Sequence, residues 1–81
     1  MRDNKKSFLK ECALYIKGDI SEVKISGNKN DVALVANVLS ESRKFYLALE
    51  SGNLKAALPQ LNKKRAASNA LKKQTGYVWP L

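Results

Sequence analysis

Histidine is absent from the 81-residue chain, and cysteine occurs once, as Cys12. Histidine is the usual general base and the commonest metal ligand at neutral pH, so its absence removes the usual catalytic triads and imidazole metal sites. A single cysteine can form neither an intrachain disulfide nor a thiolate metal cluster. We therefore expect no catalytic residues, no cofactor and no metal site, and the sequence argues against an enzyme.

Long apolar runs are missing as well. No stretch approaches the ~20 apolar residues that span a bilayer. The basic start, MRDNKKSFLKE, lacks the apolar region of roughly 7–15 residues that a secretory signal carries. Together with the unpaired cysteine, these features predict a protein of the reducing cytoplasm, without membrane contact.

Acidic residues are absent from the C-terminal part of the chain. Residues 1–50 contain nine Lys/Arg and seven Asp/Glu, a net charge of +2, whereas residues 51–81 contain six Lys/Arg and no Asp/Glu. Most of the formal net charge of +8 therefore lies in the last 31 residues. A segment with only positive charge attracts polyanions such as nucleic acid, or an acidic protein.

The clearest periodic stretch is residues 31–51, DVALVANVLSESRKFYLALES. Its apolar residues recur at three- and four-residue steps, which predicts an amphipathic helix that ends at Gly52. A second long helix is predicted for residues 59–74, with Pro59 at its first position. The short connection makes the two helices antiparallel neighbours. After Gly76, the tail is expected to fold back so that Trp79 and Leu81 cover the helical pair.

The N-terminal part fits two structures. Residues 9–17 match a helix or an alternating strand, whereas Val23 and Ile25 alternate with polar neighbours as in a half-buried strand. Because a strand needs a partner for its backbone groups, we expect residues 9–17 to pair with this strand as a hairpin. The alternative is a single strand that pairs with its copy in a second subunit. The predicted fold class is α+β, with a flexible basic arm (residues 1–7) and one small domain (residues 8–81).

The order of one strand, SEVKIS, and two helices, residues 31–51 and 59–74, is similar to that of the ribbon-helix-helix repressors. The resemblance implies a dimer that places paired strands in the major groove of DNA. It extends to the order of elements only. The connection SGNLKAALP is longer than the tight turn of that family, and no residue roles are carried over.

The candidate binding residues lie on the second predicted helix, opposite its apolar stripe. Basic side chains there would neutralise phosphates and release counterions, and an asparagine could bond a phosphate or a base edge. The predicted nucleic-acid-binding residues are Lys63, Arg65, Asn69, Lys72 and Lys73. Base stacking by Tyr77 or Trp79 is a further option, against the packing of these rings in the core.

Two alternatives remain. The first is a protein-binding adaptor or inhibitor, of the kind that phages and mobile elements carry. In that case Leu34 and Leu47, which lie off the main apolar stripe, would contact the partner, and the lysines would complement an acidic protein. The second is a self-assembling structural subunit, and a homodimer would help so small a domain.

Overall fold

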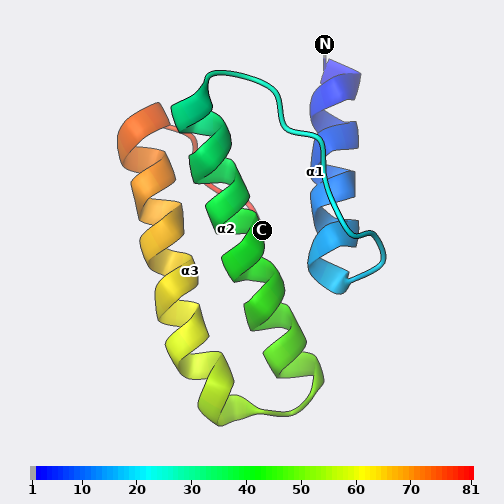
Figure 1. The fold of residues 1–81 in the computed structure, drawn as a ribbon, viewed down its shortest axis with the longest axis vertical. Coiled ribbons are helices and arrows are strands. Elements are labelled where there is room, and N and C mark those ends of the chain that lie inside the picture. The colour runs from blue at the N-terminus through cyan, green and yellow to red at the C-terminus, as the bar shows by residue number, and fades with distance from the viewer. Residues whose placement is uncertain (1) are drawn as a thin grey trace.

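Three α-helices form the whole regular structure in the computed structural model, which describes the backbone of residues 2–81 and the side chains of residues 7–81. They are α1 (Arg2–Lys17), α2 (Lys29–Glu50) and α3 (Leu54–Thr75). Figure 1 shows α2 in the middle, with α1 on one side and α3 on the other. The molecule is flat, with extents of 38 × 27 × 18 Å. Within residues 2–81, no helix is apolar over a length that would cross a bilayer.

The expected α+β class is wrong, because no strand forms within residues 2–81. The segment predicted as the first strand, residues 9–17, belongs to α1. Its buried side chains, Cys12 and Ile16, are four residues apart, with Phe8 and Tyr15 packed beside them. This is the spacing of one helix face, and a strand partner is not required. The proposed ribbon-helix-helix ribbon therefore has no counterpart in the described chain.

The segment predicted as the second strand is an extended crossover. The helices α1 and α2 run in the same direction, so residues 18–28 must return along α1 to reach the start of α2 (Figure 1). Val23 and Ile25 are half-buried against the core, whereas Glu22, Lys24 and Ser26 are exposed. An extended segment that lies on a helical surface alternates like a strand because successive side chains point to opposite sides. The alternation of apolar and polar residues in this segment therefore reflects burial on one side, without pairing to another strand.

The helix predicted for residues 31–51 is confirmed as α2, which spans Lys29–Glu50. The side chain of Asn28 accepts a hydrogen bond from the backbone N–H of Asp31 at 2.9 Å and caps the first turn. Val38, Leu39 and Ser42 are buried along its inner face. Arg43 lies 4.6 Å from the ring centre of Tyr15 in α1, a cation–π contact between the two helices.

The helix α3 starts earlier than predicted. Asn53 caps it by accepting from the N–H of Ala56 at 3.2 Å, so the helix begins at Leu54 and Pro59 lies inside it. The cap and the hydrogen bonds of the first turn outweigh the missing donor of Pro59. Gln60 fastens this half of α3 to α2, since its amide nitrogen donates to the carbonyl oxygen of Glu41 at 3.2 Å and to its carboxylate at 2.9 Å.

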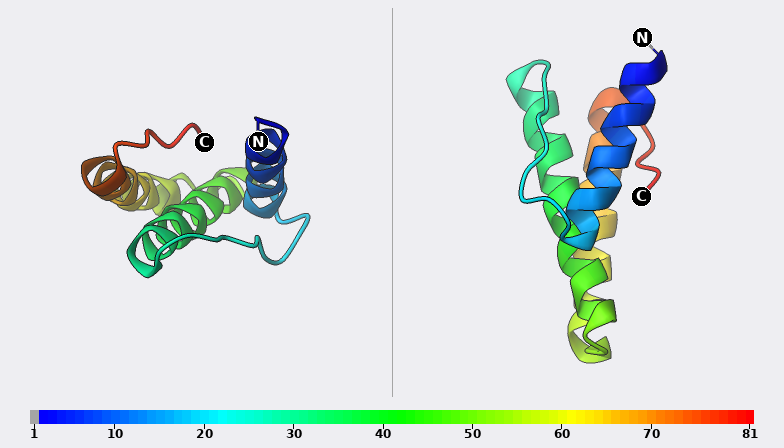
Figure 2. Two further views of the ribbon diagram at one scale, coloured as in Figure 1. Left: turned by 90° about the horizontal axis from the view of Figure 1, so that it is seen from above. Right: turned by 90° about the vertical axis from the view of Figure 1, so that its right-hand side faces the viewer.

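The tail after Gly76 folds back between α3 and α1 (Figure 2). The expected burial of Trp79 is confirmed, since its side chain is only 7% exposed. Leu81 remains 38% exposed, and its carbonyl oxygen accepts a hydrogen bond from Lys64 Nζ at 2.7 Å. All three helices and the tail contribute to one core: Cys12, Ile16, Val38, Leu39, Ala67, Leu71 and Trp79.

The predicted arm, residues 1–7, overlaps the first turns of α1. Its basic side chains, Arg2, Lys5 and Lys6, lie outside the described residues. The division of the chain at residue 7 stays a prediction.

Candidate nucleic-acid interface

The helix α3 presents one side to the protein and the other to solvent. Ala57, Ala67 and Leu71 are its buried residues, and two of these three are alanines. Small side chains let two helix backbones approach closely, so α3 lies flat along α2 (Figure 1). The opposite side of a 22-residue helix is therefore open along its length.

Four of the five predicted binding residues share this outer side. Arg65, Asn69 and Lys72 are exposed and follow one another at four- and three-residue steps, with Lys73 beside them. At 3.6 residues per turn, Lys63 lies about 160° around the helix axis from Arg65. Lys63 is exposed as well, but it faces another direction. Around the axis, Arg65, Asn69 and Lys72 lie within about 60° of one another, and Lys63 lies apart from these three. Lys73 lies about 80° from both Arg65 and Lys63 and forms the edge of this side.

Two further polar residues extend this surface toward the start of α3. Lys55 and Asn62 are exposed and lie about 40° or less from Asn69 or Lys73 around the axis. Neither Lys55 nor Asn62 was among the predicted binding residues. The spacing of these residues could have revealed them, because positions 55, 62, 69 and 73 lie on one side of a helix that starts at Leu54. We call Lys55, Asn62, Arg65, Asn69, Lys72 and Lys73 the outer face of α3.

The cations of the outer face have no acidic partner within the described residues. The ion pair of the described chain joins Lys44 and Glu41, both in α2, at 3.4 Å. The sequence from residue 51 onward contains no Asp or Glu that could neutralise α3 locally. Lys72 and Lys73 lie in the last turn, where the helix dipole itself favours positive charge. The outer face can therefore take up phosphates without breaking an ion pair of the described side chains.

Lys64 is the basic residue of α3 that turns inward. Its Nζ donates to the carbonyl oxygen of Leu81 and lies 5.4 Å from the ring centre of Phe45. These contacts hold the tail and cover the aromatic ring. The side chain of Lys64 thus packs against the protein, whereas the side chains of Lys63 and Arg65 are exposed.

The two leucines proposed for a protein partner differ in their surroundings. Leu34 is half-buried and packs against the core of its own chain. Leu47 is 44% exposed near the end of α2. Leu54 and Leu58 of α3 are more exposed than either, and neither was among the residues predicted to contact a partner.

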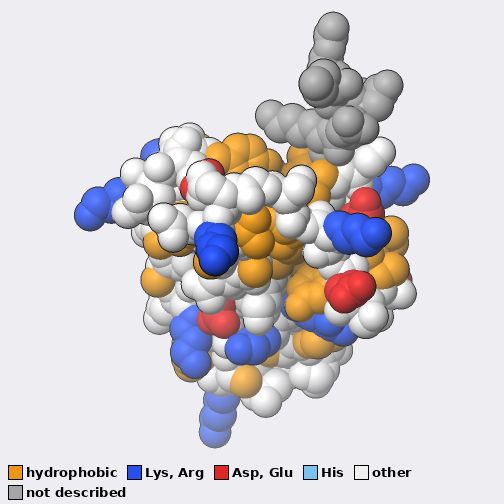
Figure 3. Space-filling model, turned by 45° about the horizontal axis from the view of Figure 1, so that its top comes forward, with side chains coloured by type: hydrophobic (Ala, Val, Ile, Leu, Met, Phe, Trp, Pro, Cys, Tyr) orange, Lys and Arg blue, Asp and Glu red, His pale blue; other side chains and the backbone are white. Residues whose placement is uncertain are grey.

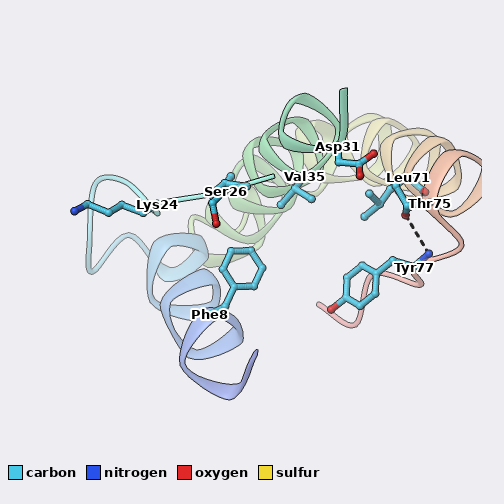
Figure 4. A pocket seen from close by; sticks show the side chains of 9 residues that line it. Phe8, Lys24, Ser26, Asp31, Val35, Leu71, Thr75 and Tyr77 are labelled. Carbon is cyan, nitrogen blue, oxygen red and sulfur yellow. Dashed lines mark hydrogen bonds between the residues drawn. The ribbon is translucent and has the colours of Figure 1, made fainter. Parts of the chain in front are cut away.

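A cleft of about 450 Å³ opens between α1, the crossover and the C-terminal end of α3 (Figure 4). In this view Phe8 and Tyr77 lie on one side of the cleft, and Val35 and Leu71 lie across from them. In the space-filling view, apolar side chains form a band in the middle of this end of the molecule, flanked by Lys and Arg (Figure 3). The sequence contained no signal for this cleft, because its walls come from all parts of the chain.

Burial raises the pKa of two groups that contact the core, the Cys12 thiol and the Tyr77 phenol. Burial raises the pKa of the Cys12 thiol from 9.0 to about 11, with a smaller contribution from the Glu11 carboxylate. Burial likewise raises the pKa of the Tyr77 phenol. No group of three or more Asp, Glu, Cys or His that could hold a metal ion occurs among the described residues.

No family model, curated protein or solved structure matches the chain.

Proposed function

We propose that the chain is a non-enzymatic nucleic-acid-binding protein that contacts phosphates through the outer face of α3. The observation that carries the proposal is the set of cations along one open side of this helix, which have no acidic partner among the described side chains and lie in a part of the sequence without acids. Lys55, Arg65, Lys72 and Lys73 supply the charge. Asn62 and Asn69 lie between them, where an amide can bond a phosphate or a base edge. Such a protein could act as a regulator.

The proposed setting is the cytoplasm. A free thiol such as Cys12 stays reduced there, and nucleic acid is available as a partner. The net charge of +8 would also speed encounter with a polyanion at low salt.

A titration against labelled nucleic acid tests the proposal. Fluorescence anisotropy with a labelled duplex and a single strand of equal length should show binding that weakens as salt is raised. Arg65→Ala combined with Lys72→Ala should weaken binding to both and reduce the slope of log K against log salt by about 1 to 2. Lys10→Ala combined with Lys29→Ala removes the same charge from exposed sites on α1 and α2 and should have a smaller effect. Absence of binding even at low salt would overturn the proposal.

Exposed leucines around the α2–α3 turn support a second candidate, a protein-binding adaptor or inhibitor with an acidic partner. Leu47, Leu54 and Leu58 are exposed by 44%, 64% and 66%. Large apolar side chains that gather at one end of a molecule often mark an interface. The same leucines would also allow a homodimer, against the repulsion between two molecules of net charge +8. Sedimentation at two concentrations tests this. If the parent and the Leu54→Glu variant are both monomers at both concentrations, the homodimer is excluded.

A further inference from the structure

The helix α3 forms one edge of the molecule. The helix α2 lies between α3 and α1, and the tail folds back on the side of α3 that faces α1 (Figure 1, Figure 2). The outer face of α3 therefore points away from the rest of the described chain. A helix with its side chains is about 10–12 Å across, and the major groove of B-form DNA is about 12 Å wide. A helix at the edge of a flat molecule can enter such a groove.

Two asparagine side chains lie along the middle of the outer face. Asn62 and Asn69 are exposed and seven residues apart, which places them about 20° apart around the axis and about 10 Å apart along it. Neither side chain makes a hydrogen bond to another described residue. The side chains of Asn28 and Asn53, by contrast, cap α2 and α3. The amides of Asn62 and Asn69 are therefore open to a ligand.

Cations lie on both sides of these two amides. Arg65 and Lys72 lie about 40–80° from them in one direction around the helix axis. Lys55 and Lys73 lie about 20–40° from them in the other direction. A helix in the major groove meets base edges at its centre and a phosphate backbone on each side. Amides between two rows of cations match this arrangement, whereas a single strand has one backbone and would engage one row.

The amide of asparagine matches adenine in the major groove. Adenine presents its N7 acceptor and its N6 amino donor there, and one asparagine can bond both. The distance of about 10 Å between Asn62 and Asn69 spans about three base-pair steps, so each amide would meet a different base pair. Leu58 is 66% exposed and lies one turn before Asn62 on the same side, where an apolar side chain can contact the methyl group of thymine.

We propose that α3 enters the major groove of duplex DNA and that Asn62 and Asn69 each bond an adenine there. The proposal rests on the proposed function, since the cations of the outer face hold the phosphates on both sides of the groove. It adds the form of the nucleic acid and the base that is recognised. Duplex RNA is a poorer occupant, because side chains do not reach the bases in its deep, narrow major groove.

Fluorescence anisotropy with three duplexes of equal length tests the proposal. The probes are a DNA duplex of adenine–thymine pairs in mixed order, the same duplex with 7-deazaadenine in place of adenine, and a duplex of guanine–cytosine pairs. 7-Deazaadenine has C–H in place of N7, so it lacks the acceptor in the major groove and keeps the minor-groove edge. The parent should bind the first duplex about 5- to 150-fold more tightly than the guanine–cytosine duplex. The 7-deazaadenine duplex should bind about 3- to 20-fold more weakly than the first.

Asn62→Ala combined with Asn69→Ala should remove both preferences, so that the three duplexes bind about equally. Alanine is a better helix former than asparagine, so this variant should melt no earlier than the parent. Asn37→Ala removes an exposed amide from α2 and is the matched control, which should keep the affinities of the parent.

The outcomes separate the two proposals. If the parent binds the three duplexes equally, or if the double asparagine variant keeps the preferences, the groove proposal is overturned. Tighter binding of a single strand or of duplex RNA than of duplex DNA overturns it as well. The proposed function still stands in these cases if Arg65→Ala with Lys72→Ala weakens binding. A parent protein that binds no nucleic acid even at low salt overturns both.

Discussion

The indole nitrogen of Trp79 donates a hydrogen bond to the hydroxyl of Ser42 at 3.2 Å, across 37 residues of sequence. Both side chains are buried, with 7% of Trp79 and 2% of Ser42 exposed. Ser42 lies on the inner stripe of α2, where a larger residue would fill the space that the indole occupies. Ser42, a small residue in an otherwise apolar stripe, is thus the residue of α2 to which the tail is hydrogen-bonded.

Ser42→Ala should lower the free energy of unfolding by about 1–3 kcal/mol, because it leaves a buried indole N–H without an acceptor. Urea denaturation followed by circular dichroism measures the loss. In a Trp79→Phe background the donor is gone, so the same serine replacement should cost close to nothing. An equal cost in both backgrounds would show that the hydrogen bond does not hold the tail.

Cys12 should make stability depend on pH in the alkaline range. Burial raises its pKa from 9.0 to about 11, so between these values the unfolded thiol loses its proton while the folded thiol keeps it. The folded state then binds more protons, and the free energy of unfolding falls as pH rises. The full shift corresponds to about 2–3 kcal/mol, present below pH 9 and lost by pH 11.

Two measurements check this expectation. The difference in unfolding free energy between the parent and Cys12→Ala should shrink as pH rises from 9 to 11, over the range set by the pKa of the thiol. At pH 8 the folded thiol should react with a disulfide reagent far more slowly than the unfolded one, because it is fully buried. Rapid labelling of the folded protein would contradict the packing of Cys12 in the core.

The two long helices were predictable because their signals are local. The three- and four-residue spacing in residues 31–51 and the alanines after Pro59 do not depend on the rest of the chain. The start of α3 was misplaced because proline favours a first helical position, whereas here the Asn53 cap starts the helix earlier. A cap and a proline compete, and only the folded chain shows which one sets the boundary.

The N-terminal half was not predictable because its pattern depends on tertiary contacts. Val23 and Ile25 alternate with polar residues since the crossover lies on the helices, and one-sided burial looks the same in a sequence as a strand. Once that strand was assumed, residues 9–17 were assigned as its partner. The candidate site was found in part, because the cations of α3 are visible as charge, whereas the cleft lined by Phe8 and Tyr77 exists only after folding.

Pro59→Ala should stabilise the protein. Pro59 is the sixth residue of α3, beyond the first turn, where a backbone N–H would bond the carbonyl oxygen of Lys55. Restoring that donor and removing the ring clash should raise the free energy of unfolding by about 1 kcal/mol, less than the ~3 kcal/mol of a mid-helix proline. Thermal unfolding measures the gain. Gln60→Ala, next in sequence, removes the bond to Glu41 and should act in the opposite direction. A destabilised Pro59→Ala protein would contradict this expectation.

Lys63 and Arg65 form a matched pair for the interface on α3. Both are exposed, both carry one charge and they are two residues apart, but they face directions about 160° apart. If the outer face binds phosphates, Arg65→Ala should weaken duplex binding by about 3- to 10-fold and reduce the salt slope by close to 1, whereas Lys63→Ala should change both much less. Anisotropy titrations at several salt concentrations measure both quantities. Equal losses from the two variants would mean that the cations act only through net charge, and a larger loss from Lys63→Ala would place the interface on the other side of the helix.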